Sequence, residues 1–294
     1  MNNETRRRDF LFGSAAAVAV PLLPRTGVAP FAKVTTPGPH LGCVTHDVLE
    51  DYSLESIIGV LEAAQFEGVE LRTDGKHGVE PGMNQAGRER VRKRFDASKI
   101  QLVSFGTITE FHSPDAEERK WNIAIAKKFI DLAKDTGAIG VKVRPNGWGE
   151  GVSHEVTIKN IGSSLNELGD YGAQRNVEIW MEVHGSGTAA PDPTAAIMNA
   201  AAHKNVGLTW NCNPTDIKDG SVKYAWDTLR PWVRAIHLKD IGAVWNYPWH
   251  EFFGLLRASG FNRWEYCEAP AVAESDTERY LKWYKTLWTE WNRA

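Results

Sequence analysis

Short apolar runs alternate with amphipathic segments along the chain from about residue 40 onward. GVELRTD (68–74) and VEIWMEV (177–183) have the length and the β-branched content of buried strands. The segment 53–65 has a helical period instead, because Leu54 and Ile58 fall on one face. Strands and helices in alternation are typical of an α/β domain with a parallel sheet.

The same pattern continues to the end of the chain. Further strands are predicted at 41–47, 100–109, 138–145, 205–211, 233–240 and 263–268. Further helices are predicted at 87–98, 113–137, 156–175, from about 192, and at 222–229, 249–258 and 277–291. The longest helix has Ser113 as its expected N-cap, Pro114 at its first position and Gly137 at its end. Eight strands and eight helices without an intervening linker predict a single (β/α)8 TIM barrel.

The first 36 residues differ from the rest and are expected to lie outside the barrel. Three arginines at 6–8 precede an apolar run at 10–23, which resembles a twin-arginine export signal. The run is shorter than the ~20 apolar residues that span a bilayer and contains prolines, so a membrane anchor is disfavoured. We therefore expect a signal peptide and linker over 1–36, a catalytic domain over 37–294, and export to the periplasm by the twin-arginine machinery.

Composition and charge narrow the range of partners. The 294 residues are 42% hydrophobic and 24% charged, as in an ordinary soluble domain. A net charge of −3 argues against nucleic acid as a partner, because phosphate binding needs a concentrated basic surface. The three cysteines, Cys43, Cys212 and Cys267, fall in predicted strands and are expected to be small buried residues, although a disulfide is left open.

Four apolar runs in the second half of the chain each end in a residue that can bind a divalent metal. These residues are Glu182, Asn211, His237 and Glu268, which are 29, 26 and 31 positions apart, about one βα unit each. Because the carboxyl ends of barrel strands meet at one face, we expect the four side chains to surround one point. Two carboxylates, an imidazole and an amide oxygen suit Mn, Mg, Co or Zn.

Other polar side chains at strand ends are candidate substrate contacts. Lys142 and Arg144 share one face of their strand, and His184 and Lys239 follow two of the predicted metal ligands. Lys142 has a second interpretation as the partner of Glu70 in a structural ion pair inside the barrel.

Twelve tryptophans weakly favour a carbohydrate ligand, because a flat ring can stack on the apolar face of a sugar. Trp148, Trp245, Trp249 and Trp264 lie near predicted strand ends or in the loops after them. Trp245 is the candidate for stacking on substrate, with ordinary packing as the alternative.

The order of MEVHG, LTWNCN, HLKD and GFNRWEYCE resembles the sugar phosphate isomerase/epimerase group of xylose isomerase-like TIM barrels. In many members the strand ends read Glu, Asp, His and Glu around one divalent cation. The resemblance implies that Glu182, His237 and Glu268 are metal ligands. Asn211 stands where an aspartate is usual, which makes the ligand set less negative. Pro214 and Ala243 also replace residues that bind substrate in the ketose 3-epimerases of the group.

The resemblance implies a metal-dependent isomerase or epimerase that transfers a proton next to a carbonyl of a small carbohydrate or keto-sugar. Glu182 and Glu268 would then serve as base and acid. One alternative is a lyase or hydratase on a keto-glycoside through the same enolate chemistry, and another is a metal-free sugar-binding barrel. A phosphodiesterase like the apurinic endonucleases is disfavoured, because the chain lacks the histidines of a trinuclear zinc site. A homo-oligomer is left open.

Overall fold

The computed structural model describes residues 38–242 and 247–293, which contain a closed barrel of parallel strands. The strands follow one another around the barrel in chain order, and the last pairs with the first. They are β1 (His40–Val44), β2 (Gly68–Arg72), β3 (Gln101–Glu110), β4 (Gly140–Arg144), β5 (Glu178–Glu182), β6 (Val206–Trp210), β7 (Val233–Leu238) and β8 (Trp264–Cys267). The predicted (β/α)8 barrel is confirmed.

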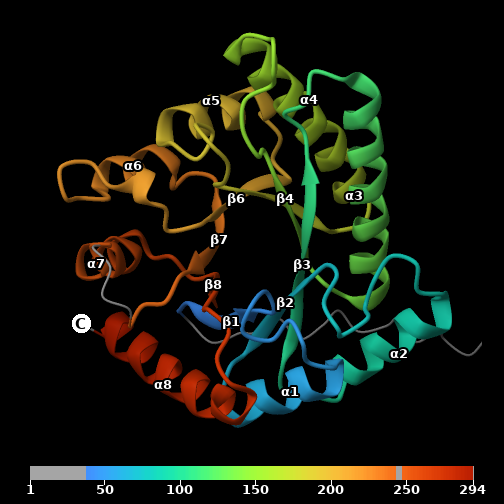
Figure 1. Ribbon diagram of the computed structural model, residues 1–294, viewed down its shortest axis with the longest axis vertical. Coiled ribbons are helices and arrows are strands. Elements are labelled where there is room, and N and C mark those ends of the chain that lie inside the picture. The colour runs from blue at the N-terminus through green and yellow to red at the C-terminus, as the bar shows by residue number, and fades with distance from the viewer. Residues whose placement is uncertain (1–37, 243–246, 294) are drawn as a thin grey trace, which may run out of the picture. The chain divides into compact units, whose positions relative to one another are not determined.

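Helices cover the outside of the strands, as Figure 1 shows. They are α1 (Leu54–Ala63), α2 (Gln85–Asp96), α3 (Ala116–Thr136), α4 (His154–Ala173), α5 (Pro191–Ala201), α6 (Lys223–Leu229), α7 (Trp249–Ser259) and α8 (Glu274–Arg293), with a 3-10 turn at Pro214–Asp216. Within the two described ranges, none of these helices has the length and apolarity needed to cross a bilayer. The predicted signal segment 1–36 lies outside the described residues and stays a prediction.

The strands alternate between a helix-facing and an interior-facing side, as a period of two requires. On β5, Ile179 and Met181 pack in the layer between sheet and helices, whereas Trp180 belongs to a separate cluster inside the barrel. Trp264 and Tyr266 from β8 join Trp180 in that interior cluster. The amino-terminal half of the barrel is therefore filled by aromatic rings.

Glycines on neighbouring strands make room for this aromatic cluster. A Cβ on Gly68 would lie 2.5 Å from the Trp264 ring, and a Cβ on Gly140 would lie 2.7 Å from the Trp180 ring. Both distances are too short for real carbon atoms, so larger residues would push the rings out of place. The cluster fills one end of the barrel, and the polar side chains lie at the other end.

Helix α3 begins two residues later than the sequence predicts. Its N-cap is Asp115, whose carboxylate accepts a hydrogen bond from the Glu117 N–H at 2.8 Å, so the expected cap at Ser113 was wrong. The Ser113 hydroxyl instead accepts from the Asp115 N–H, within the turn that leads into the helix. The predicted end at Gly137 is confirmed, since that residue adopts the left-handed C-cap conformation at φ 89°.

The three cysteines are buried and free, as expected for small packed residues. Cys43 and Cys267 face each other in the register of β1 and β8, and Cys212 lies two residues beyond the end of β6. No disulfide joins them.

Candidate metal and substrate site

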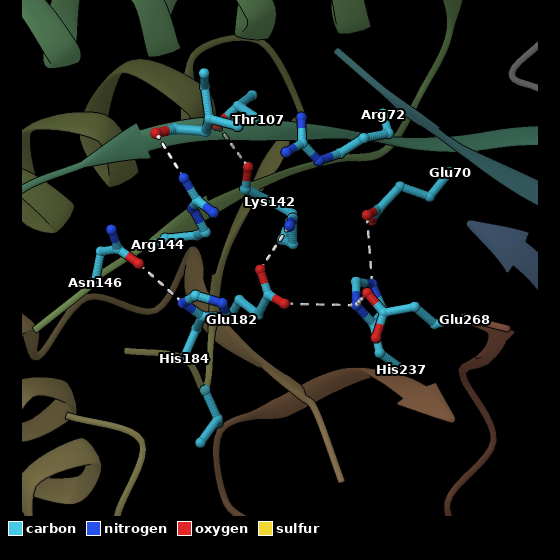
Figure 2. A network of polar contacts seen from close by, with 12 residues as sticks. Glu70, Arg72, Thr107, Lys142, Arg144, Asn146, Glu182, His184, His237 and Glu268 are labelled. Carbon is cyan, nitrogen blue, oxygen red and sulfur yellow. Dashed lines mark hydrogen bonds and ion pairs between the residues drawn. The ribbon is translucent and has the colours of Figure 1, made fainter. Parts of the chain in front are cut away.

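Three of the predicted metal ligands converge at the carboxyl end of the barrel. Glu182 ends β5, His237 lies on β7 and Glu268 follows β8. One ligand atom from each lies within 4.8 Å of the others. The Nδ1 of His237 is 3.4 Å from Glu268 Oε1 and 3.8 Å from Glu182 Oε1. Figure 2 shows the three side chains turned toward one another.

The other nitrogen of His237 is oriented by Glu70, a residue to which sequence reasoning gave a different partner. Glu70 Oε1 lies 3.3 Å from His237 Nε2, and the Ser104 hydroxyl donates to Glu70 Oε2 at 2.8 Å. A carboxylate behind the imidazole fixes its ring orientation and leaves Nδ1 for the centre of the site. The inward position of Glu70 on β2 was visible in the sequence, but its partner on β7 was not.

Two lysines hold the two glutamates from the side away from the histidine. Lys142 Nζ lies 2.6 Å from Glu182 Oε2, so the alternative that paired Lys142 with Glu70 was wrong. Lys239 Nζ lies 2.5 Å from Glu268 Oε2. Each glutamate thus has Oε2 bound to an ammonium group and Oε1 facing His237.

Neighbouring cations keep both carboxylates ionised in spite of their burial. Burial alone would raise the pKa of Glu182, but Lys142 and His237 outweigh it and the pKa is lowered. Burial opposes ionisation of Glu268 in the same way, and its pKa is also held low, by His237 and Lys239. Burial would lower the pKa of His237, yet Glu268 and Glu70 raise it to about 9. The carboxylates therefore attract positive charge to their common point.

The fourth predicted ligand, Asn211, lies just beyond β6 and is buried. Its Oδ1 has no hydrogen-bond partner among the described residues, which is unusual for a buried amide oxygen. The loop around it is fixed, because Asn213 Nδ2 donates to Val183 O at 2.6 Å and the Asn213 N–H donates to Asp216 at 2.7 Å. The side chains of Asn213 and Asp216 are thus engaged in contacts that hold the loop, whereas the Asn211 amide oxygen is not.

This donor set fits a divalent cation. Two ligands bonded to one metal at about 2.1 Å with a tetrahedral angle lie about 3.4 Å apart, close to the separations around His237 Nδ1. Two ionised carboxylates, an imidazole that loses its Nδ1 proton when a metal binds, and an orphaned amide oxygen supply the mixed oxygen and nitrogen ligands that Mn, Co and Zn accept. The residues that would hold it are Glu182, Asn211, His237 and Glu268.

A cavity of about 590 Å³ opens above these residues. All four charged or polar side chains predicted to contact substrate line it, namely Lys142, Arg144, His184 and Lys239. His46 and Arg72 line it as well. This volume suits a ligand of the size of a small sugar.

The tryptophans proposed for sugar stacking do not form this cavity. Trp245 lies outside the described residues. Trp148 stacks on His154 at 3.8 Å, Trp249 packs against Tyr247 and Phe253, and Trp264 belongs to the aromatic cluster at the opposite end of the barrel. Within the described part of the chain no tryptophan lines the cavity. A position in a loop after a strand was therefore not enough to tell a tryptophan that packs from one that binds a sugar.

His184 is supported by a chain of polar contacts that sequence reasoning found only in part. Its Nδ1 lies 2.9 Å from Asn146 Oδ1, and Asn146 Nδ2 donates to Glu110. Because a carbonyl oxygen only accepts, Nδ1 carries the proton and Nε2 is an acceptor. Burial, together with the cations Arg144, Lys142 and Lys239, lowers the pKa of His184, which is therefore neutral at pH 7. Glu110 was missed, since it lies at the far end of an unusually long strand.

The chain belongs to the xylose isomerase-like TIM barrel family, because the model of that family matches residues 58–287. A comparison with curated proteins found no match.

Solved structures share the fold over most of the chain. The chain is similar to the IOLI protein with a bound zinc atom, at 17% identity and a TM-score of 0.72 over 86% of this chain and 98% of that one. It is similar to D-psicose 3-epimerase from Clostridium cellulolyticum H10, at 13% identity and a TM-score of 0.72 over 86% and 99%. It is also similar to 3-keto-D-glucoside 4-epimerase from E. coli, at 15% identity and a TM-score of 0.69 over 85% and 99%. At these identities the likeness establishes the shared fold.

Proposed function

We propose that the protein is a metal-dependent isomerase or epimerase that acts on a small carbohydrate or keto-sugar by proton transfer at a carbon next to a carbonyl. The observation that carries the proposal is the convergence of Glu182, His237 and Glu268 beneath a polar cavity, with each glutamate held ionised by a lysine. The epimerases among the structural neighbours support the same class of reaction.

We assign the proton transfer to the two glutamates, one on each side of a substrate carbon. Glu182 comes from β5 and Glu268 follows β8, so they reach the site from strands that are not adjacent in the barrel. One carboxylate removes the carbon-bound proton, and the other, itself ionised, passes a proton from its lysine ammonium to the opposite face, which inverts the centre. When bound, a divalent cation supplies Lewis-acid polarisation of a substrate oxygen.

The remaining polar side chains orient the substrate. The ammonium groups of Lys142 and Lys239 keep the glutamates ionised and offer N–H donors to substrate oxygens. His184 Nε2 accepts a hydrogen bond from a substrate hydroxyl, because its Nδ1 proton is committed to Asn146.

A lyase or hydratase reaction on a keto-glycoside is the second candidate, and one observation favours it. The Lys239 side chain is about one-third exposed in the cavity beside Glu268, where its ammonium could protonate a departing group. The same proton removal followed by loss of a β-substituent gives elimination in place of epimerisation. Product analysis separates the two reactions.

The test is hydrogen exchange in deuterated water. The purified full chain, loaded in turn with Mn²⁺, Co²⁺ and Zn²⁺, is incubated with free ketoses, inositol derivatives and 3-keto-glycosides. Deuterium incorporation at carbon, followed by mass spectrometry, is the expected result. No incorporation across the panel by protein that holds its metal would refute proton transfer and favour a sugar-binding barrel.

The segment 1–36 adds a proposal about location. Its arginines at 6–8 and its short apolar run support export through the twin-arginine machinery to the periplasm. This route carries folded proteins, so the barrel would receive its metal before export. Replacing Arg7 and Arg8 with lysine is expected to leave the protein in the cytoplasmic fraction. Unchanged periplasmic recovery would exclude this route.

A further inference from the structure

One side of the cavity carries three cationic side chains, and one of them, Lys142, pairs with a glutamate of the proposed proton-transfer pair. Arg72, Lys142 and Arg144 come from β2 and β4, which flank β3. Figure 2 shows the three side chains on the same side of the site, with the Lys142 ammonium turned toward Glu182. All three line the cavity.

A glycine on the intervening strand creates the space between two of these cations. In the strand register Arg72 lies beside Gly106, and Gly106 lies beside Lys142. A Cβ on Gly106 would lie 2.7 Å from Glu70 Oε1 and 3.3 Å from Arg72 Cδ. Without a side chain at that position, Arg72 extends across β3 into the mouth of the barrel.

Arg72 has no carboxylate partner among residues 38–242 and 247–293. No ion pair joins it to any acid in the described ranges, and its one hydrogen bond from the guanidinium goes to the carbonyl of Thr73 at 3.3 Å. The nearest acid along the strand, Glu70, is already bound to Ser104 and His237. A half-buried guanidinium without a counter-ion is poised to bind an anion.

Arg144 is only partly neutralised. Its closest carboxylate oxygen, on Glu110, lies 3.7 Å away, and that same oxygen accepts a hydrogen bond from Asn146. The Arg144 Nε is buried and has no hydrogen-bond partner in the described part of the chain. Lys142 differs, because its ammonium group already has Glu182 as a counter-ion at 2.6 Å. Within the described residues, the cationic groups on this side without a close carboxylate are therefore Arg72 and Arg144.

We propose that the substrate is a sugar acid whose carboxylate binds between Arg72 and Arg144, while its reacting carbon lies near Glu182 and Glu268. This assignment rests on the proposed isomerase function, because that function places a small carbohydrate in the cavity. A planar carboxylate matches the fork of the guanidinium N–H groups, and two arginines can share its two oxygens. A neutral sugar would leave Arg72 without a counter-ion and Arg144 with Glu110 at 3.7 Å as its carboxylate partner.

Binding of matched sugars by the full chain tests the proposal without turnover. Isothermal titration is carried out with D-glucuronate and D-galacturonate against D-glucose and D-galactose, and with D-glucose 6-phosphate as a third class. The uronates are expected to bind at least about tenfold more tightly than the neutral sugars, because a charged hydrogen bond contributes that much. Their affinity is expected to fall with added salt.

Substitution of the two arginines shows where the anion binds. Arg72→Gln and Arg144→Gln are each expected to weaken uronate binding about 10- to 100-fold and to leave binding of the neutral sugars within about twofold. Arg72→Lys retains the charge without the fork and should give an intermediate loss. Arg90→Gln, on an exposed residue of α2, is the matched control and should change nothing. Thermal unfolding of each variant shows whether the fold is intact.

Three results would overturn the proposal. The first is that uronates bind no more tightly than neutral sugars, or do not bind. The second is an unchanged uronate affinity in folded Arg72→Gln and Arg144→Gln. The third is tighter binding of D-glucose 6-phosphate than of the uronates, which would identify the anion as a phosphate. Failure of the proposed function has a different signature. If uronate binding depends on both arginines but no substrate exchanges deuterium, the anion site is supported and the proposed isomerase activity is refuted.

Discussion

Glu265, the second residue of β8, and Glu268, the residue after that strand, lie three positions apart, and their surroundings give them opposite properties. Glu265 faces α8, where it accepts hydrogen bonds from Trp288 at 2.6 Å and from Asn292 at 3.3 Å. Burial raises the pKa of Glu265 to about 7, although the hydrogen bonds from Trp288 and Asn292 lower it in part. The pKa of Glu268, which faces the cavity, is held low against the effect of burial by His237 and Lys239.

The difference shows what the site adds to a buried carboxyl group. Burial by itself favours the neutral form, as it does for Glu265. At the carboxyl end of the barrel, ammonium groups and an imidazole offset that cost and keep two carboxylates charged. A charged base at neutral pH therefore depends on the lysines as much as on the glutamates.

The largest expected effect is on proton transfer. Glu268→Gln should lower the rate of deuterium exchange by about 10²- to 10⁴-fold, because it removes an acid–base group. Glu265→Gln makes the same chemical change three residues away, outside the cavity, and should leave the rate unchanged. Both rates are measured by mass spectrometry on folded protein. Equal rates in the two variants would contradict the role of Glu268.

Loss of a lysine should destabilise the protein strongly. Lys142→Met leaves the Glu182 carboxylate buried without its partner, since the two side chains are only 5% and 4% exposed. We expect the free energy of unfolding in urea to fall by about 3–5 kcal/mol. The double variant Lys142→Met/Glu182→Gln should recover part of that loss. A single variant as stable as the wild type would mean that the ion pair contributes nothing.

The pH dependence of stability should distinguish Glu265 from an exposed glutamate. Its pKa is about 7 in the folded protein and near 4.5 in the unfolded chain. Between these values only the folded state holds the proton, so stability falls as pH rises from about 4.5 to 7, and the full cost remains above 7.

Glu265→Gln removes that cost. Relative to wild type at each pH, the variant should gain about 3 kcal/mol between pH 4.5 and pH 8, as urea unfolding measures. Glu89→Gln, on an exposed residue of α2, serves as the control and should show no such gain. A pH-independent difference for Glu265→Gln would mean that this carboxyl group is ionised in the folded protein throughout.

The smallest expected effect is on the free energy of unfolding, and it comes from loss of a neutral hydrogen-bond donor to Glu265. Trp288→Phe keeps the aromatic packing and removes the indole N–H that binds the carboxyl group. We expect a loss of about 1–3 kcal/mol in the free energy of unfolding at pH 8, where the carboxylate is ionised, and a smaller loss at pH 5. Equal losses at the two pH values would assign the effect to packing.

The fold was predictable because each strand and helix has its own local signal. The apolar runs of β2 and β5 and the helical period of 53–65 gave elements at the correct places, and a barrel then followed from strict alternation. The end of α3 at Gly137 was also local. Its N-cap was predicted wrongly at Ser113, since serine and aspartate are both good caps and the path of the incoming turn decides between Ser113 and Asp115.

The site was predictable only as far as the register of strands allows. Strand ends that meet at one face bring Glu182, His237 and Glu268 together, and sequence spacing is enough to see it. Which cation pairs with which acid depends on side-chain reach across the barrel. Lys142 could turn toward Glu70 or toward Glu182, and nothing local in the sequence decides between the two.

The most direct test of the central claim is the metal content of the full chain. After equilibration with Mn²⁺ or Zn²⁺ and removal of free ion, elemental analysis should find about one cation per chain in the wild type. It should find far less in His237→Ala, and an unchanged amount in Glu265→Gln. Wild-type protein without metal, or a His237→Ala variant that retains it, would contradict a cation site at these residues.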